Sequence, residues 1–472
     1  MTSPTAADAE NATAYSTEST AGESSRNTYS HPIWVPPSYD VTSSPSLLHT
    51  RTISQQGASS TNFARWAKWC PDGSTALAQC ENASLEYIDF PHEALSPAPD
   101  ISSLAHRSTS FPQPAPILDF VWYPRATCTD PASFCFVASV RECPVKLLDA
   151  ADGRLRASYK IVDHRERQIA PHSLAFNPLS TKLYCGFEDA IEVFDVGYPG
   201  EGTRLRIISS LTFSSDMSSG LYAAGSFSPS APTSSNIALF TEVSGEVPVM
   251  YVGDEDSARG FGIRSSVSQL MFNPLRPYLL YASFRRETSI FCWDIRGDVG
   301  HPIEVFDSAA PPRGGHSATH DAADVPDSKR KVAATNQRLR FDMDISGSWL
   351  GVGDQDGGIA IFSLHSAAEG EARADAASSR SVTSPALKFK AHNDAVGSVA
   401  FHPLRPLVLS VSGSRHFDTA DSEDLSEEDG SDSDQDGERS ASPRVPVRIK
   451  PKSSAPVPQD TTAKLWDFTH AS

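Results

Sequence analysis

Short runs of alternating hydrophobic and polar residues recur along most of the chain, separated by turn residues. The stretch "NFARWAKWCPDGSTALAQCENASLEYIDF", which begins at Asn62, contains an apolar run, a Pro-Asp-Gly turn, a second run, a polar turn and a third run ending in Asp-Phe. Alternation with a period of two between turns of this composition predicts antiparallel strands. The same order of runs and turns returns in six further units, which begin at Ile117, His172, Ile207, Ser265, Asn336 and Ala395.

Seven units of about four short strands, at a spacing of about 40 to 50 residues, are typical of a β-propeller of the WD-repeat kind. A single blade cannot bury both of its faces, so the ring has to close. We therefore predict an all-β, seven-bladed WD-repeat β-propeller over residues 46–468. Residues 1–45 are rich in Ser, Thr, Ala and Pro and are predicted to be a disordered tail, and disordered insertions are predicted at about 309–331, 366–384 and 415–459.

The final unit is split by the longest insertion, because its third strand, "TTAKLWDF", follows a long acidic stretch. It lacks an outer strand of its own, and Ser46–Ser54, "SLLHTRTIS", is the unassigned strand-like run that could supply one. Many WD repeats connect four polar side chains, and buried polar groups of this sort are stable when they are hydrogen-bonded to one another. The predicted tetrad is His392, Ser412, Asp460 and Trp466.

The charge of the chain is concentrated in one place. The formal net charge is -18, and the stretch from Asp418 to Glu438 holds eleven acidic residues and no basic one. An acidic total therefore does not exclude a basic surface elsewhere, and we expect the acidic tract to emerge from the same face of the propeller as the arginines discussed below.

The seven cysteines include no C-x-x-C pair, which favours reduced, buried thiols over disulfides or a zinc site. The N-terminus does not have the pattern of a signal peptide and no run reaches membrane-spanning length, so we expect a nuclear or cytoplasmic protein.

Arginines recur in the predicted turns between second and third strands and in the connections between blades, which share one face of a propeller. A solvated rim with scattered ion pairs is one interpretation of them. Binding of structured RNA is the other, because guanidinium groups bind phosphate bidentately and stack on unpaired bases. Trp66, Trp69, Phe284 and Phe417 are aromatic candidates beside them, although Trp69 also fits a position in the core. The candidate RNA-binding residues are Arg141, Arg285, Arg286, Arg338, Arg340, Arg415 and His416.

Catalysis has little support in the sequence. It contains no G-x-S-x-G, no Gly-rich phosphate loop with Lys-Ser/Thr and no His/Cys/Asp cluster at metal-ligand spacing. We therefore expect a monomeric protein that is not an enzyme, with no cofactor, no metal and no small-molecule substrate.

The tetrapeptide "WDIR", from Trp293 to Arg296, leaves a second function open. It is either the ordinary end of a third strand or a Trp-Asp-x-Arg box, through which WD-repeat substrate receptors dock on the adaptor of a cullin-RING ubiquitin ligase. In that alternative Trp293, Asp294 and Arg296 would form the docking site.

Several segments together resemble the telomerase Cajal body protein family, and the resemblance covers most of Phe63 to Phe468. The most specific is "ASVRECPVKLLDAADGRLRASY", and "NFARWAKWCPDGS", "CWDIR" and "TNQRLRFDMDISGSWL" agree in chain order. The resemblance implies a non-enzymatic adaptor that recognises a loop motif in small Cajal-body guide RNAs and telomerase RNA and helps to localise their ribonucleoproteins. It further implies a nuclear location, in the Cajal body or nucleoplasm and partly in the cytoplasm.

Overall fold

The computed structural model describes residues 34–54, 61–88, 90, 110–187, 190–198, 200, 203–206, 210–226, 236–245, 247–253, 266–312, 335–364, 381–416 and 456–469. The secondary structure of these residues consists of strands, as predicted. From Pro36 onward the chain forms one compact unit. No helix long and apolar enough to span a bilayer occurs in the part of the chain that the structure describes.

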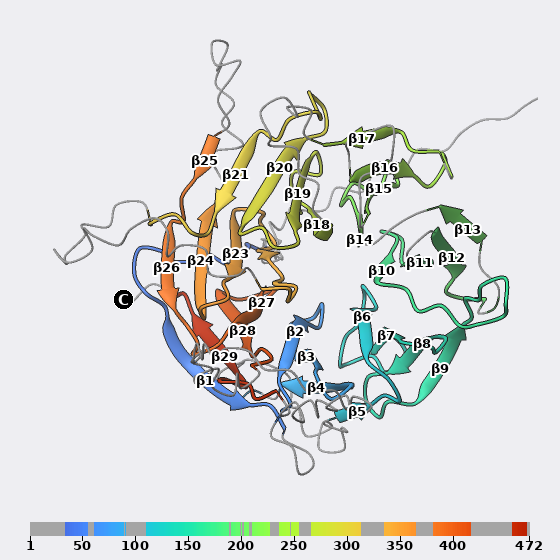
Figure 1. Cartoon of the computed structure of the whole chain (residues 1–472), viewed down its shortest axis with the longest axis horizontal. Coiled ribbons are helices and arrows are strands. Elements are labelled where there is room, and N and C mark those ends of the chain that lie inside the picture. Colours follow the sequence, from blue (N-terminus) through green and yellow to red (C-terminus); the bar gives the residue numbers. More distant parts are fainter. Residues whose placement is uncertain are drawn as a thin grey trace, which may run out of the picture. The chain divides into compact units, whose positions relative to one another are not determined.

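The strands form seven sheets that follow one another around a ring (Figure 1), and their strands pair antiparallel except for one added strand in blade 5. Blade 1 contains β2 (Ala64–Trp69), β3 (Ala76–Cys80), β4 (Ser84–Ile88) and β5 (Ser110–Pro112), and blade 2 contains β6 (Ile117–Trp122), β7 (Cys135–Val140), β8 (Val145–Asp149) and β9 (Leu155–Tyr159). Blade 3 contains β10 (Ser173–Phe176), β11 (Lys182–Phe187), β12 (Ala190–Asp195) and β13 (Thr203–Arg206), and blade 4 contains β14 (Ser210–Phe213), β15 (Leu221–Gly225), β16 (Ile237–Thr241) and β17 (Met250–Val252).

The remaining blades complete the ring. Blade 5 contains β18 (Val267–Phe272), β19 (Leu279–Phe284), β20 (Ser289–Asp294), β21 (Glu304–Asp307) and β25 (Ser381–Thr383), and blade 6 contains β22 (Asp342–Met343), β23 (Trp349–Gly353), β24 (Gly358–Ser363) and β26 (Leu387–Lys390). Blade 7 contains β27 (Val396–Phe401), β28 (Leu407–Ser412), β29 (Thr462–Asp467) and β1 (Ser46–Thr52). The innermost strands of all seven blades line one central channel. The predicted seven-bladed propeller is thus confirmed.

Blade 7 is closed as the sequence predicts. Strand β1 pairs antiparallel with β29, in a register that runs from Ser46 opposite Asp467 to Thr52 opposite Thr462. The strand order β1-β29-β28-β27 joins a segment near the start of the chain to one near its end. This pairing covers the edge of β29 and closes the ring.

The predicted disordered tail ends earlier than residue 45, because Tyr39 anchors the segment just before β1 to blade 7. The Tyr39 side chain is buried, and its ring packs edge-on against Phe401, with ring centroids 5.2 Å apart. Its hydroxyl donates to the Arg405 carbonyl at 3.0 Å, and the Asp40 amide donates to the Phe468 carbonyl at 2.8 Å. One buried aromatic side chain therefore orders a stretch whose composition alone indicates disorder.

The three predicted insertions lie mostly outside the described residues, which leave out 313–334, 365–380 and 417–455, and with them the acidic tract. The predicted end of the second insertion, at about residue 384, is wrong, because Ser381–Thr383 forms strand β25. This strand pairs in parallel with β21, and the Thr383 hydroxyl donates to the buried Glu304 carboxylate. Blade 5 consequently has five strands.

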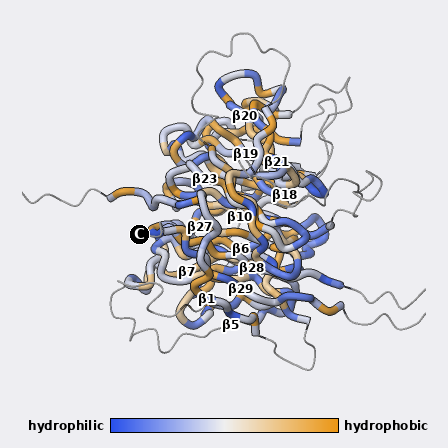
Figure 2. The backbone as a smooth tube through the Cα atoms, turned by 90° about the vertical axis from the view of Figure 1, so that its left-hand side faces the viewer, coloured by the Kyte–Doolittle hydropathy of each residue, from blue (hydrophilic) through white to orange (hydrophobic). Residues whose placement is uncertain are grey.

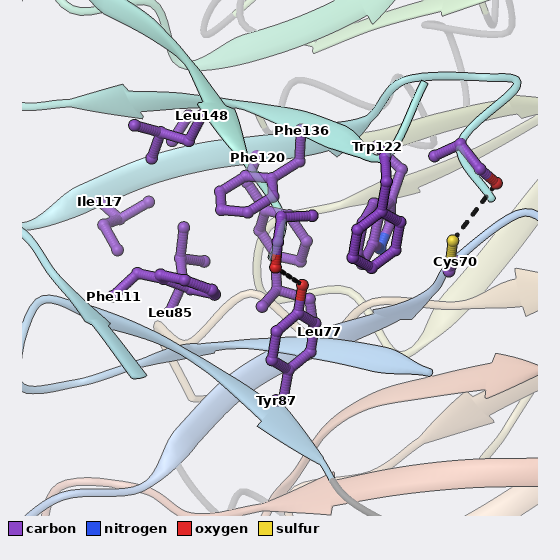
Figure 3. Packing of buried hydrophobic residues seen from close by; sticks show 14 of the residues in the cluster. Cys70, Leu77, Leu85, Tyr87, Phe111, Ile117, Phe120, Trp122, Phe136 and Leu148 are labelled. Carbon is purple, nitrogen blue, oxygen red and sulfur yellow. Dashed lines mark hydrogen bonds between the residues drawn. The ribbon is translucent and has the colours of Figure 1, made fainter. Parts of the chain in front are cut away.

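Hydrophobic side chains fill the spaces between neighbouring blades. Figure 2 shows hydrophobic residues along the strands and hydrophilic residues in many of the connections. Between blades 1 and 2, Leu77 and Phe120 pack in a cluster where the Tyr87 hydroxyl donates to the Ala150 carbonyl (Figure 3). All seven cysteines are free thiols and five of them are buried. Burial raises the pKa of the Cys135 thiol to about 11, which leaves it protonated and unreactive at neutral pH.

The predicted tetrad is present in blade 7 with one correction. His392 Nε2 lies 2.8 Å from Ser410 Oγ, and Trp466 Nε1 donates to the same oxygen at 2.8 Å. His392 Nδ1 lies 3.3 Å from Asp460 Oδ2. The serine of the tetrad is therefore Ser410, whereas Ser412 donates to the carbonyls of Asp394 and Ala395. The two serines occupy the same face of β28, and only the pairing register decides which one meets His392.

Candidate nucleic-acid interface

The arginine-bearing turns lie at one end of the blades. Because neighbouring strands in a blade are antiparallel, the turn between its second and third strands and the connection to the next blade share one end, which we call the upper face. Contacts between blades agree with this placement. Glu81, in the β3–β4 turn, accepts from Arg65 Nε at 2.5 Å and from Arg415 Nε, beyond β28, at 2.6 Å.

The segment Thr335–Arg340 crosses the upper face from blade 5 to the central channel. At its outer end Arg286 Nε donates to Asn336 Oδ1 at 2.8 Å. Further along, the Gln337 side-chain amide donates to the Gly413 carbonyl at 2.9 Å, and the Arg340 backbone amide donates to the Gly397 carbonyl at 2.9 Å. These bonds position Arg338 and Arg340 beside the mouth of the channel.

Two cations approach the same indole ring in the channel, which has a volume of about 570 Å³. The Arg340 guanidinium carbon lies 4.6 Å from the centre of the Trp66 ring, and Lys68 Nζ lies 4.3 Å from it. Lys68 Nζ donates to the Phe120 carbonyl at 3.3 Å, and Arg340 donates to the Ser268 carbonyl at 3.4 Å. Cation–π contacts and neutral carbonyls hold these groups without neutralising them.

Burial and mutual repulsion lower the pKa values of the cations around the channel mouth. Burial, together with the charges of Arg340 and Arg285, lowers the pKa of Arg338 to about 10, although Asp119 acts in the opposite direction. The pKa of Lys68 is lowered by burial, and the charge of Arg340 lowers it further. The pKa of Arg340 is also lowered by burial. We call Lys68, Arg285, Arg338 and Arg340 the axial cation cluster.

Two carboxyl groups accompany the axial cation cluster. Asp119 is buried, and its Oδ2 accepts from the Leu174 amide at 2.7 Å, while its Oδ1 has no hydrogen-bond partner within the described chain. Burial raises the pKa of Asp342 to about 7, and its Oδ2 accepts from the Phe401 amide at 2.8 Å. Asp342 is thus only partly ionised at neutral pH, so the two acids cannot balance four cations.

The other predicted RNA-binding residues differ in whether their side chains already have hydrogen-bond or ion-pair partners. Arg141, in the β7–β8 turn, is exposed, and its side chain makes no hydrogen bond or ion pair with residues that the structure describes. Arg286 has a positive φ of 63° and holds Asn336. Arg415 pairs with Glu81, and His416 Nε2 lies 3.0 Å from Asp394 Oδ1. The structure therefore brings Arg285, Arg338 and Arg340 together, whereas Arg141 lies on another blade and Arg415 and His416 are paired locally.

Sequence reasoning missed Lys68, Asp119 and Asp342. Each lies on the innermost strand of its blade, within a stretch that reads as an ordinary half-buried strand. A charged residue at a repeated position of the first strand is the one signal that could have indicated the channel. Of the aromatic candidates, Trp66 contacts two members of the axial cation cluster, and Trp69 and Phe284 are buried in the core. Phe417 lies outside the described residues.

The "WDIR" segment is held by local contacts. Trp293 is fully buried, and its Nε1 donates to the Gly253 carbonyl at 2.9 Å. Arg296 forms an ion pair with Asp294 at 2.7 Å and stacks over the Tyr278 ring at 3.4 Å. The guanidinium that an adaptor would bind is thus already engaged within the blade, although it is largely exposed.

No group of three or more His, Cys, Asp or Glu side chains in the described part of the chain could hold a metal ion. The axial cation cluster offers guanidinium and ammonium groups, which are able to bind anions.

Comparison with known proteins agrees with the sequence resemblance. No family model matches the chain. Telomerase Cajal body protein 1 of Mesocricetus auratus is 28% identical over 393 residues, which cover 80% of this chain and 63% of the relative. The human protein of that name is 25% identical over 413 residues, covering 85% of this chain and 65% of the relative. Guanine nucleotide-binding protein negative regulator 1 of Schizosaccharomyces pombe is 32% identical over 151 residues, 32% of this chain and 38% of the relative.

The chain spans slightly less than two thirds of the length of the mammalian relatives that it matches. The matches nevertheless cover most of the propeller, in agreement with the segments quoted above. Over about 80% of its length the chain is thus similar to the proteins named Telomerase Cajal body protein 1.

Proposed function

We propose that this protein is a non-enzymatic scaffold that binds structured RNA on its upper face. The RNAs are small nuclear or Cajal-body guide RNAs and telomerase RNA, and the protein supports the localisation or assembly of their ribonucleoproteins in the nucleus, and hence telomere maintenance. The names of the relatives, which contain both telomerase and the Cajal body, support this choice of cargo.

The observation that carries the proposal is that the guanidinium of Arg338 is partly buried without a partner among the described residues. Its guanidinium is partly buried and has no hydrogen bond or ion pair within the described residues, while Arg285 and Arg340 repel it. A desolvated cation without a partner is costly for the folded protein unless an anion binds to it. A phosphate group would satisfy the fork geometry of the guanidinium and relieve the repulsion within the cluster.

Structured RNA fits this surface better than a small anion does. The cations continue outward from Arg338 through Arg285 to Arg286, and exposed Arg141 and Arg415 lie farther around the upper face. Such spacing suits a phosphate backbone that follows the face, with unpaired loop bases available for stacking on guanidinium groups.

The test is to compare Arg338→Ala with Arg125→Ala. Arg125 is an exposed arginine in the β6–β7 turn, at the opposite end of the blade. Binding of a synthetic stem-loop RNA is measured by fluorescence anisotropy over a range of salt concentrations. Loss of one phosphate contact should lower the slope of log K against log salt by about 0.7 to 0.9 in Arg338→Ala and leave it unchanged in Arg125→Ala. Equal slopes for the wild type and both variants would refute a role for the axial cation cluster in RNA binding.

A further inference from the structure

A second cavity opens beside the axial cation cluster, between blades 5 and 6. It has a volume of about 440 Å³, within the range of roughly 300 to 1,000 Å³ typical of small-molecule sites. Its walls are the β19–β20 turn, the segment Thr335–Leu339 and the β23–β24 turn. We call it the blade 5–6 pocket.

The wall of the blade 5–6 pocket is apolar on one side. Phe284, Ile290 and Val352 are buried, and Leu339 is partly buried in the segment that crosses the upper face. Such a wall favours a flat or apolar group over a fully hydrated ion.

The polar side of the pocket includes groups that are already bonded. Asp354 Oδ1 accepts from the amides of Asp356 and Gly358, at 3.0 and 2.6 Å. Lys388 Nζ donates to the Ser308 carbonyl at 2.8 Å and lies 3.6 Å from Asp354 Oδ2. These side chains already have partners within the two blades, so they leave little capacity for a ligand.

Three other side chains of the pocket wall remain without such bonds. Ser283 is 8% exposed, and its Oγ is buried with no hydrogen-bond partner in the described residues. The side chains of Arg285 and Glu287 likewise make no hydrogen bond or ion pair within the described chain. A buried hydroxyl without a partner is unfavourable, and a ligand donor or acceptor would satisfy it once the hydroxyl rotates toward the pocket.

We propose that the blade 5–6 pocket binds one unpaired nucleobase of the RNA, while the phosphate of the same nucleotide lies on Arg285. This inference rests on the proposed function, since it adds base recognition to the phosphate contacts of the axial cation cluster. The acidic side chains of the pocket disfavour a bare phosphate or a polyphosphate inside it, whereas a neutral heterocycle has both an apolar face and a polar edge. Glu287 can only accept when ionised. The exocyclic amino group of adenine or cytosine can donate to it, whereas uracil has a carbonyl oxygen at that position, so Glu287 favours bases with an exocyclic amino group over uracil.

The test uses single-stranded oligo-A, oligo-C and oligo-U of equal length as probes. Wild-type protein should bind oligo-A and oligo-C roughly tenfold more tightly than oligo-U, because one charge-assisted hydrogen bond is lost with uracil. Glu287→Gln should remove most of this preference. Ser283→Leu should fill the pocket and weaken binding of all three probes roughly tenfold, through the loss of base stacking, with an unchanged salt slope. Ser219→Leu, at an exposed position of the β14–β15 turn, is the control and should behave as the wild type does.

The outcomes separate this inference from the proposed function. Salt-dependent RNA binding with no preference among the probes, or a preference that survives Glu287→Gln and Ser283→Leu, overturns the pocket and leaves the cation cluster in place. Absence of salt-dependent binding by the wild type overturns the proposed function, and the pocket with it. Should Ser283→Leu fail to fold, Ser283→Ala tests the hydroxyl alone and should weaken binding of oligo-A and oligo-C a few-fold.

Discussion

Replacing Ser410 with Ala should destabilise the propeller much more than replacing Ser412 with Ala. The Ser410 hydroxyl connects two buried side chains, since it accepts from Trp466 Nε1 and donates to His392 Nε2 when His392 Nδ1 donates to Asp460. Burial lowers the pKa of His392, which keeps the imidazole neutral at about pH 7 and consistent with this arrangement. Removal of the hydroxyl leaves one donor and one acceptor buried without partners.

The expected magnitude follows from these two orphaned atoms. A buried polar atom left without a hydrogen bond costs about 1 to 3 kcal/mol, so Ser410→Ala should lower the free energy of unfolding by roughly 2 to 5 kcal/mol. Ser412 donates one hydrogen, shared between two backbone carbonyls that keep lone pairs for other donors. Its removal should cost about 0.5 to 1.5 kcal/mol.

Urea denaturation followed by tryptophan fluorescence measures both effects, compared at equal m-values. A Trp466→Phe change removes the orphaned indole donor, so in the Ser410→Ala background it should cost less than it does in the wild type. A Ser412→Ala variant as unstable as Ser410→Ala, or additive costs for Ser410→Ala and Trp466→Phe, would refute the hydrogen-bond assignment.

Two further predictions concern the edges of the propeller and the charge in its channel. Tyr39→Ala should lower the free energy of unfolding by about 3 kcal/mol in urea denaturation, because it removes a buried ring and its hydroxyl contact. Deletion of residues 1–33 should leave the urea midpoint unchanged. Equal effects of the two changes would contradict the role of Tyr39 as an anchor. Burial raises the pKa of Asp342 in the folded protein to about 7. Between about pH 4 and pH 7 the carboxyl therefore ionises in the unfolded chain but stays protonated in the folded one. The wild type should lose stability as the pH rises through this range. Asp342→Asn should therefore match the wild type near pH 4 and exceed it by roughly 1 to 3 kcal/mol near pH 8, and a difference independent of pH would contradict the assignment.

The sequence by itself determined the repeat, because strands and turns are encoded locally. Alternating apolar positions separated by Pro, Gly and Asp residues indicate the strands of each blade without knowledge of their neighbours. The closing strand was also predictable, since β29 needs a partner and Ser46–Ser54 has the strand pattern that remains unassigned. The arginines of the upper face followed from their turns, because the alternation of antiparallel strands assigns each turn to one end of the blade.

Only the tertiary structure decided which of these side chains meet. Ser410 and Ser412 share one face of β28, so periodicity treats them alike and the register against β29 alone selects Ser410. Tyr39 lies in a stretch of disordered composition, and its burial depends on a pocket built from residues more than 300 positions away. Lys68, Asp119 and Arg340 come from three different blades and meet because ring closure brings the innermost strands around one axis. The loss of solvent there lowers the pKa values of Lys68 and Arg340, an effect that depends on burial and distance and cannot be inferred from the order of residues along the chain.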